Sequence, residues 1–258
     1  MASFDEHPRR QRLLAELSAA AVFLTRVPLP AAAVVAEGSL AETVWAFPLI
    51  GAGIGACCGL LFALARFLGL GSAAAALLAL LLGVLLTGAM HEDGLADTAD
   101  GFGGGRSREE KLAIMRDSRH GTFAVAATLF SLGLRAAALA AIGRPLNAAL
   151  ALIAAHAVSR ALLPLAALAL EPARTEGLGA AFGEPPLPAT LVALALALVF
   201  VLLTLGPLAG LLGLALAALG DLAVVSLARR QIGGYTGDVL GAIEQVGEIA
   251  VLLVASAQ

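Results

Sequence analysis

The sequence contains few charged residues. Only 14% of its 258 residues are Asp, Glu, Lys or Arg, whereas 60% are hydrophobic and the mean hydropathy is +0.93. Soluble domains carry about 25% charged residues, so this composition excludes an ordinary soluble protein and indicates an integral membrane protein. The net charge of −3 is too small to favour nucleic acid as a partner. The two cysteines, Cys57 and Cys58, are adjacent and poorly placed to bridge each other, so no disulfide framework is expected.

Several common catalytic motifs are also missing. The chain has no Gly-x-Ser-x-Gly, P-loop or dinucleotide fingerprint, and no second His or Cys is spaced with His156 for a zinc site. No cleavable signal peptide is expected, because the first twelve residues are charged and the apolar run after them ends at Arg26 and Pro28.

Long apolar segments predict an all-α fold, a polytopic integral membrane helix bundle that forms one domain over residues 1–258. About seven transmembrane helices are expected, at Val44–Phe67, Ser72–Met90, Gly121–Ile142, Leu146–Leu170, Ala189–Leu205, Pro207–Ala228 and Val239–Ala255. Residues 1–43 form an N-terminal arm, in which Leu13–Leu29 is a short interfacial or half-inserted helix. The alternative is that this segment spans the membrane, with Arg26 reaching the interface.

Basic residues are unevenly distributed between the two ends of these spans. With the N-terminus in the cytoplasm, the outer segments hold only Arg66 and Arg144. The cytoplasmic segments hold Arg9, Arg10, Arg12, Arg26, Arg106, Arg108, Lys111, Arg116, Arg119, Arg174, Arg229 and Arg230. By the positive-inside rule, residues 91–120 and the turn at 229–238 then lie together on the cytoplasmic face of a bacterial inner membrane.

The segment 91–101 reads HEDGLADTADG and follows an apolar span directly. In a helix, Asp93, Asp97 and Asp100 lie within roughly 60° of one another. Three carboxylates on one stripe repel one another unless a cation lies between them, and such oxygen ligands suit Mg²⁺, which completes its shell with water and substrate phosphates. The stripe therefore predicts a magnesium site.

A glycine-rich run and five basic residues follow the acidic segment. The glycines Gly101, Gly103 and Gly104 belong to a predicted turn whose backbone N–H groups could approach phosphate oxygens, and arginine can bind phosphate with two hydrogen bonds. Together the three features predict a metal and diphosphate site at residues 91–120. The alternative is a solvated, charged loop with a short helix.

Ionisable residues inside the predicted spans need partners, because a charge in a membrane helix is costly. They are Arg135, His156, Arg160, Asp221, Glu244 and Glu248. Internal ion pairs and a functional cavity are both open for most of them, whereas Arg160 and Glu244 lie deep enough to line a cavity. The second cytoplasmic turn, GGYTGD at 233–238, ends at Asp238, which either completes the site or only caps the last helix.

Five segments resemble the signature of cobalamin synthase, the adenosylcobinamide-GDP ribazoletransferase family. They are HEDGLADTADG at 91–101, MRDSRHGTF at 115–123, FLTRVP at 23–28, FPLIG at 47–51, and GGYTGD with LGA between 233 and 242. The match runs in order along nearly the whole chain. Glu92 stands where this resemblance leads us to expect an apolar residue.

The resemblance implies transfer of α-ribazole, or its 5′-phosphate, to adenosylcobinamide-GDP with release of GMP, and Mg²⁺ as cofactor. It implies metal ligands at Asp93, Asp97, Asp100 and Asp117, and catalytic roles for Asp100, Arg116 and Arg119. The residues expected to bind substrate are Arg26, Gly101, Gly103, Gly104, Ser118, Thr122, Arg160, Gly233, Gly234, Thr236, Asp238 and Glu244. Further expected partners are the lipid bilayer, a second copy of the chain and other cobalamin-assembly enzymes, with no nucleic acid.

Two other classes compete with an enzyme. A cation- or proton-coupled transporter would use the intramembrane acids, but its site would lie near mid-membrane between related halves. A membrane scaffold would not need acids at helical spacing. The densest charge lies at span ends on one face, which favours the enzyme.

Overall fold

The structure, a computed structural model, describes residues 6–28 and 40–258. The first five residues of the predicted arm and the segment 29–39 lie outside these ranges. The described secondary structure is helical except for one bridge between Pro172 and Tyr235. The elements are α1 (Glu6–Leu24), the 3₁₀ helix η2 (Leu40–Ala46), α2 (Phe47–Phe67), α3 (Ser72–Thr87), α4 (Met90–Gly104), α5 (Arg108–Ile114), α6 (Thr122–Ile142), α7 (Pro145–Ala169), α8 (Leu178–Phe182), α9 (Leu187–Ile232) and α10 (Gly237–Ser256).

These helices form a membrane bundle, as the composition predicts. Five helices are long and apolar enough to cross a bilayer, and the bent pair α3–α4 is a sixth candidate. Seven spans were predicted because the region of α9 was expected to form two spans, 189–205 and 207–228. α9 is assigned as one element, but Gly206 inside it is non-helical, with φ 75° and ψ 173°, and Pro207 follows. The break falls at the predicted boundary between the two spans.

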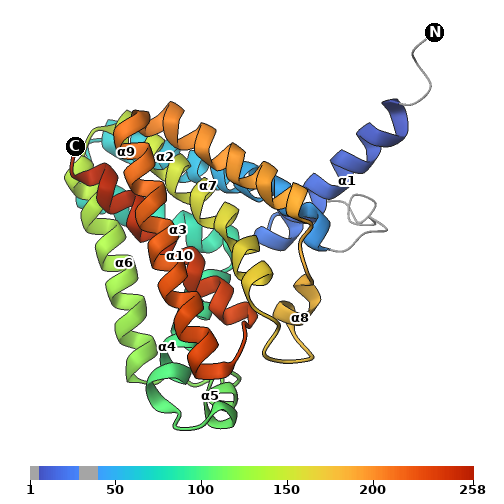
Figure 1. The fold of residues 1–258 in the computed structure, drawn as a ribbon. Helices are drawn as coiled ribbons and strands as arrows, with labels where there is room; N and C mark the ends of the chain where they lie inside the picture. Colours follow the sequence, from blue (N-terminus) through green and yellow to red (C-terminus); the bar gives the residue numbers. More distant parts are fainter. Residues whose placement is uncertain (1–5, 29–39) are drawn as a thin grey trace.

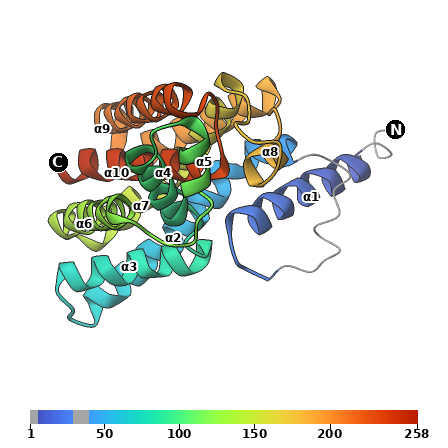
Figure 2. The ribbon, with the colours of Figure 1, turned by 90° about the horizontal axis from the view of Figure 1, so that it is seen from below.

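The N-terminal helix α1 is not among the candidate spans of the described residues. It extends away from the bundle towards the N-terminus in both views (Figures 1 and 2). Its polar contacts include Arg12, whose Nε lies 2.8 Å from Glu16 Oε1, and Trp45, whose Nε1 donates to Glu16 Oε2 at 2.7 Å. This placement agrees with a helix outside the bundle rather than a span within it.

The buried helix α7 lies at the centre and packs against α2, α9 and α10. Three α2 glycines four residues apart, Gly51, Gly55 and Gly59, lie against the backbone of α7 at His156, Leu152 and Ala149. A Cβ atom on Gly59 would lie 2.6 Å from the Cα of Ala149. These glycines therefore serve close helix packing, the usual device in membranes, and not a substrate groove.

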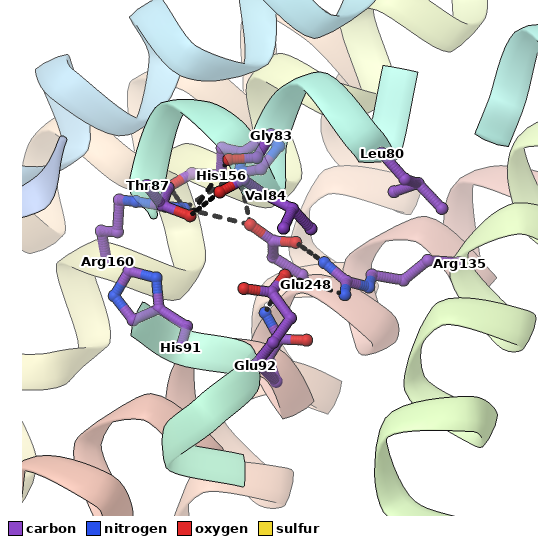
Figure 3. A pocket seen from close by; sticks show the side chains of 11 residues that line it. Leu80, Gly83, Val84, Thr87, His91, Glu92, Arg135, His156, Arg160 and Glu248 are labelled. Carbon is purple, nitrogen blue, oxygen red and sulfur yellow. Dashed lines mark hydrogen bonds and ion pairs between the residues drawn. The ribbon is translucent and has the colours of Figure 1, made fainter. Parts of the chain in front are cut away.

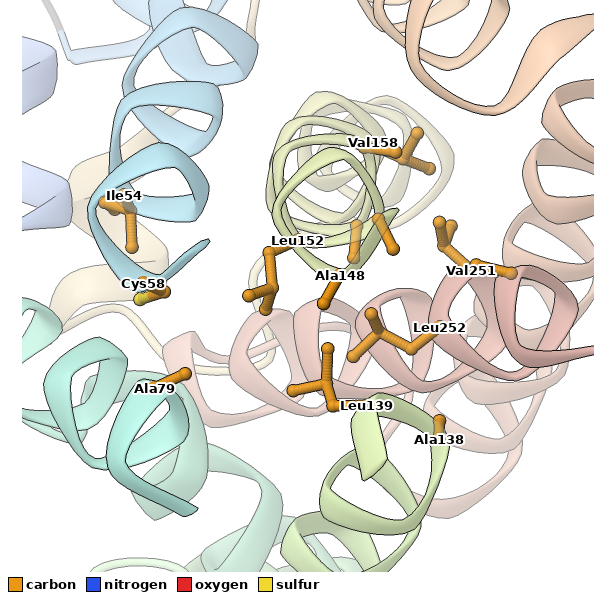
Figure 4. Close-up of a cluster of buried hydrophobic side chains, with 14 of the residues drawn as sticks. Ile54, Cys58, Ala79, Ala138, Leu139, Ala148, Leu152, Val158, Val251 and Leu252 are labelled. Atoms are coloured by element: carbon orange, nitrogen blue, oxygen red, sulfur yellow. The ribbon is translucent and has the colours of Figure 1, made fainter. Parts of the chain in front are cut away.

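The apolar core lies between α2, α3, α6, α7, α9 and α10. Figure 4 shows Ile54, Leu139, Leu152 and Leu252, which α2, α6, α7 and α10 contribute to this core. Many other large apolar side chains are exposed on the outer surfaces, and Leu203 on α9 is 78% exposed. Apolar side chains exposed in this number identify the outer surface as the one that contacts lipid.

The span predicted to end at Met90 stops three residues earlier, at a sharp corner. Gly88 and Ala89 both have left-handed backbone conformations, with φ values of 66° and 60°, and α4 leaves the corner at 90° to α3. The backbone N–H of Arg26 donates to Leu86 O at 2.7 Å, and the Arg26 side chain lies over Gly88. The corner therefore directs the acidic helix α4 across the end of the bundle, where Figure 1 shows it beside α5.

Candidate active site

The acidic segment forms α4, as its spacing predicts, and α4 crosses the start of α10 at two glycines. A Cβ atom on Gly94 would lie 2.8 Å from Asp238 O and 3.0 Å from the Cα of Gly241. Only glycine permits this approach, which carries the first turn of α10 onto the acidic helix. The two polar stretches, about 140 residues apart in sequence, therefore meet.

Asp238 is the carboxylate that this crossing adds to the stripe. The charges that act most strongly on Asp97 are the carboxylates of Asp93 and Asp238. Asp238 Oδ2 accepts a hydrogen bond from Thr236 Oγ1 at 3.1 Å and lies 3.7 Å from Arg174 Nη1. Asp93 is exposed, whereas Asp97 and Asp238 are half-buried. The result is a cluster of three acids at the surface of the bundle end.

Asp100 differs from these three acids because backbone groups already occupy its carboxylate. Its two carboxylate oxygens accept backbone N–H groups at the start of α6, from Gly121 and, at 2.9 Å, from Ala124. It is also buried. In this arrangement Asp100 caps α6 and links it to α4, while Asp238 occupies the third position beside Asp93 and Asp97.

The glycine-rich run is helical, which corrects the predicted turn. α4 continues to Gly104, so the N–H groups of Gly101 and Gly103 lie within a helix. A Cβ atom on Gly103 would lie 2.6 Å from the Phe123 ring, and one on Gly101 would meet Met115. The glycines here allow α5 and α6 to pack closely on the end of α4.

The loop after α5 carries the remaining predicted residues of the first segment. Asp117 pairs with Arg119 at 2.6 Å and also accepts the Arg119 backbone N–H at 3.0 Å. The Arg119 guanidinium lowers the pKa of Asp117 to about 2. Arg116, Ser118 and Thr122 are exposed in or beside this loop. The predicted ligand Asp117 therefore has a cationic partner of its own.

The second cytoplasmic turn, between α9 and α10, contains Gly233, Gly234 and Thr236, which were predicted to bind substrate. Gly233 ends α9 with φ 72°, and Thr236 caps α10 by accepting the Val239 N–H at 3.3 Å. The carbonyl of Glu171 lies against Gly234, where Tyr235 N donates to it at 3.0 Å. The turn is thus bound to the loop that contains Arg174.

Except for Asp221, the ionisable residues within the spans form one buried network beneath α4 (Figure 3). Arg160 Nη1 lies 2.6 Å from Glu244 and 3.1 Å from Glu248, and Arg135 Nη1 lies 2.7 Å from Glu248. Glu92 joins it by accepting from Arg135 at 3.2 Å, which gives the unexpected acid a partner. The cavity beside them has only about 10 Å³, enough for about one water.

Arg160 and Glu244, which were expected to bind substrate, are completely buried in this network. His91 and His156 also belong to it, with His91 Nδ1 3.7 Å from Glu244 and His156 against Glu248. The network joins α4, α6, α7 and α10, so it holds the acidic helix on the bundle. Asp221 remains outside it, and neither of its carboxylate oxygens is hydrogen-bonded within residues 6–28 and 40–258.

Two acid groups could be considered for a metal ion. Among the described residues, the one group of His, Cys, Asp or Glu with ligand atoms all within 4.8 Å is His156, Glu244 and Glu248. Arg160 already donates to or pairs with all three, so its charge takes the place of a metal. Asp93, Asp97 and Asp238 offer carboxylate oxygens at a surface that water reaches, but these oxygens do not all lie within 4.8 Å of one another. This arrangement suits Mg²⁺ held partly through water, since Mg²⁺ keeps several waters.

The sequence analysis counted Arg174 and Arg108 among the cytoplasmic basic residues but gave neither of them a role in the site. Arg108 donates to the carbonyls of Ile232 and Ala173 at 2.8 and 2.7 Å, and Arg174 donates to the carbonyl of Leu112 at 3.1 Å. These bonds fix α5 against the two loops. Arg174 lies in a segment predicted only as a loop, and no spacing relates it to Asp238.

Fold and site together define a polytopic membrane protein with an acidic cluster and arginines gathered at one end of the bundle. The family model for cobalamin-5-phosphate synthase matches residues 16–256. The chain therefore belongs to the cobalamin-5-phosphate synthase family, as its motifs indicate.

Curated relatives support this assignment over almost the full length. An adenosylcobinamide-GDP ribazoletransferase from Bradyrhizobium diazoefficiens is 49% identical over 247 residues, which cover 96% of this chain and 95% of that protein. Proteins of the same name from Azorhizobium caulinodans and Mesorhizobium japonicum are 46% and 45% identical, covering 95% of this chain and 96% and 94% of theirs. No solved structure matches the chain.

Proposed function

We propose that this protein joins α-ribazole, or its 5′-phosphate, to adenosylcobinamide-GDP and releases GMP in cobalamin biosynthesis. The family membership and the name of its relatives supply the substrates. The observation that carries the proposal is the meeting of Asp238 with Asp93 and Asp97, beside Arg174, at one end of the bundle. Carboxylates for a cation next to an arginine are what diphosphate chemistry requires.

In this proposal Asp93, Asp97 and Asp238 would hold Mg²⁺. When bound, Mg²⁺ supplies charge neutralisation for the diphosphate and for the leaving GMP. Arg174 and Arg116 bind phosphate oxygens and orient the diphosphate. The cap at Thr236 and the buried network fix the positions of α10 and α4.

The chemical step is attack by a ribose hydroxyl of ribazole on the phosphorus that carries cobinamide. Because the 5′ position carries the phosphate in ribazole 5′-phosphate, the attacking group is another hydroxyl of the ribose. The new P–O bond forms, the bond between the two phosphates breaks, and GMP leaves. The hydroxyl proton passes to a carboxylate. Asp100 was predicted for this role, but both its oxygens accept backbone N–H groups. Asp93 is exposed, and no ion pair to it occurs among the described residues, so it is better placed.

The structure gives the transporter alternative no support. The ionisable groups inside the spans are paired with one another around a cavity of about 10 Å³. A substrate path through that region would require these pairs to separate. The surface acids instead lie at one end of the bundle.

We also infer that this end faces the cytoplasm in the bacterial inner membrane, from the distribution of basic residues. Single cysteines at Ser107 and Gln231, in a background without Cys57 and Cys58, test this orientation. Neither should react with an impermeant thiol reagent added outside intact cells. Reaction of either one from outside would contradict it.

The activity itself is tested with purified protein in lipid nanodiscs. Wild-type protein, adenosylcobinamide-GDP, α-ribazole and Mg²⁺ should yield cobalamin and GMP in equal amounts. Asp93→Asn and Asp97→Asn should each lose most of the rate, whereas Glu176→Gln, at an exposed loop residue, should keep it. Absence of product with the wild-type protein, or full rates for both Asp variants at saturating Mg²⁺, would refute the proposal.

A further inference from the structure

An open cleft of about 440 Å³ lies between α5 and the loop at 173–175. Its lining includes Arg108, Arg116 and Arg174, which are brought together from two segments more than fifty residues apart. Pockets of roughly 300–1,000 Å³ are typical of small-molecule sites. The cleft is therefore large enough for a nucleotide.

The three arginines differ in how far their guanidinium groups are already engaged by protein partners. Arg108 uses Nε and Nη2 on the carbonyls of Ile232 and Ala173, so it mainly holds the cleft together. Arg116 is exposed, and no ion pair to it occurs among the described residues. Two charged arginines beside a cleft, one of them uncompensated, favour an anion between them.

Arg174 connects the cleft to the acidic cluster. One nitrogen, Nη1, lies 3.7 Å from Asp238, while Nε is buried without a hydrogen-bond partner in the described part of the chain. Burial lowers the pKa of Arg174. The carboxylate of Asp238 raises this pKa, and the nearby Arg116 lowers it further. A phosphate at this place would satisfy both arginines.

One acid also lines the cleft. Glu109 is exposed in the first turn of α5. Its carboxylate has two acceptor oxygens, and guanine presents two N–H donors, N1–H and the 2-amino group, on one edge. Adenine presents an acceptor at N1, which a carboxylate repels. The cleft thus carries a phosphate-binding side and a group able to select guanine.

We propose that the cleft binds the GMP half of the nucleotide substrate, with its phosphate on Arg116 and Arg174 and its base at Glu109. The inference rests on the proposed function, because it assigns the leaving group of that reaction. It places the phosphate next to Asp238, so the bond to be broken lies between the cleft and the acidic cluster. Neither Arg174 nor Glu109 is singled out by the sequence motifs.

The test is the binding of GMP itself to the full-length protein in nanodiscs, by isothermal titration calorimetry. Arg116→Gln and Arg174→Gln should each weaken GMP binding by about tenfold or more, because each removes charge-assisted hydrogen bonds to phosphate. Arg106→Gln is the matched control, since it removes an exposed arginine from the same segment that does not line the cleft. It should change affinity by less than about twofold.

Arg174→Gln also removes the bond to Leu112 and could loosen α5, which is why Arg116→Gln carries equal weight. For the base, Glu109→Gln should lower the preference for GMP over AMP by about tenfold. Unchanged GMP affinity in both arginine variants, or an unchanged preference in Glu109→Gln, would overturn the proposal.

The same variants separate this inference from the proposed function. If wild-type protein makes cobalamin but the arginine variants bind GMP normally, the cleft assignment fails and the activity stands. If wild-type protein makes no product but binds GMP through Arg116 and Arg174, the assignment of the cleft stands and the proposed reaction fails.

Discussion

Replacing Arg160 with methionine should destabilise the protein without affecting substrate affinity. Arg160 is fully buried, and its guanidinium lies 2.6 Å from Glu244 and 3.1 Å from Glu248. Methionine fills similar space but leaves two carboxylates buried with less compensation. The sequence alone placed Arg160 among the substrate-binding residues, so this variant decides between a structural and a binding role.

The magnitude follows from the contacts. Removing one partner of a buried ion pair costs about 3–5 kcal/mol. In a protein of this size, each kcal/mol shifts the melting temperature by about 2–4 °C, so a decrease of about 10 °C is expected. The double variant Arg160→Met, Glu244→Gln should recover part of the loss, with a coupling energy of about 1–3 kcal/mol.

Thermal unfolding in nanodiscs gives the stability, and initial rates at low temperature give the KM for each substrate. The structural account predicts a lower Tm with both KM values unchanged. A KM raised about tenfold with an unchanged Tm would show that Arg160 contacts substrate and would refute the placement.

Two further predictions concern the corner and the loop. Ala89 has φ 60°, so Ala89→Gly should raise the free energy of unfolding by up to about 1 kcal/mol and Ala89→Val should lower it, as thermal unfolding would show; a stabilising valine would contradict the strain. The pKa of Asp117, lowered to about 2 by Arg119, means that the stabilisation from this pair is complete above about pH 4 and is lost as the pH falls towards 2. Arg119→Gln should return that pKa towards its ordinary value in a carboxyl NMR titration, and an unchanged pKa would exclude the pair.

The sequence was sufficient for the fold class, most of the spans and the family. Apolar segments of membrane-spanning length are a direct physical signal. In the structure, α6 and α7 begin and end within one residue of their predicted bounds. The helical stripe of Asp93 and Asp97 was also readable, because its spacing is local.

The tertiary contacts could not be read in the same way. The run at Gly101–Gly105 has the composition of a turn, yet packing against Phe123 and Met115 keeps most of it helical. The early end of the second span depends on two left-handed residues, one of which is alanine. Local propensity gives no sign of either feature.

The partners of charged groups were the least predictable part of the site. Arg174 lies beside Asp238 only because the loop at 171–173 pairs with the turn at Tyr235. Asp100 has the spacing of a ligand but caps α6. In each case the deciding contact joins segments distant in sequence.

The central claim is that α10 brings Asp238 into the site formed by α4. The most direct measurement is the rate of GMP release by Asp238→Asn, compared with Asp221→Asn, which alters a buried acid outside the cluster. We predict that Asp238→Asn loses more than about tenfold in rate while its stability falls by no more than about 1 kcal/mol, because Thr236 and not Asp238 caps α10. Asp221→Asn should keep its rate. A full rate for Asp238→Asn would leave that residue only as a first-turn acid that accepts a hydrogen bond from the cap Thr236, and would contradict the account.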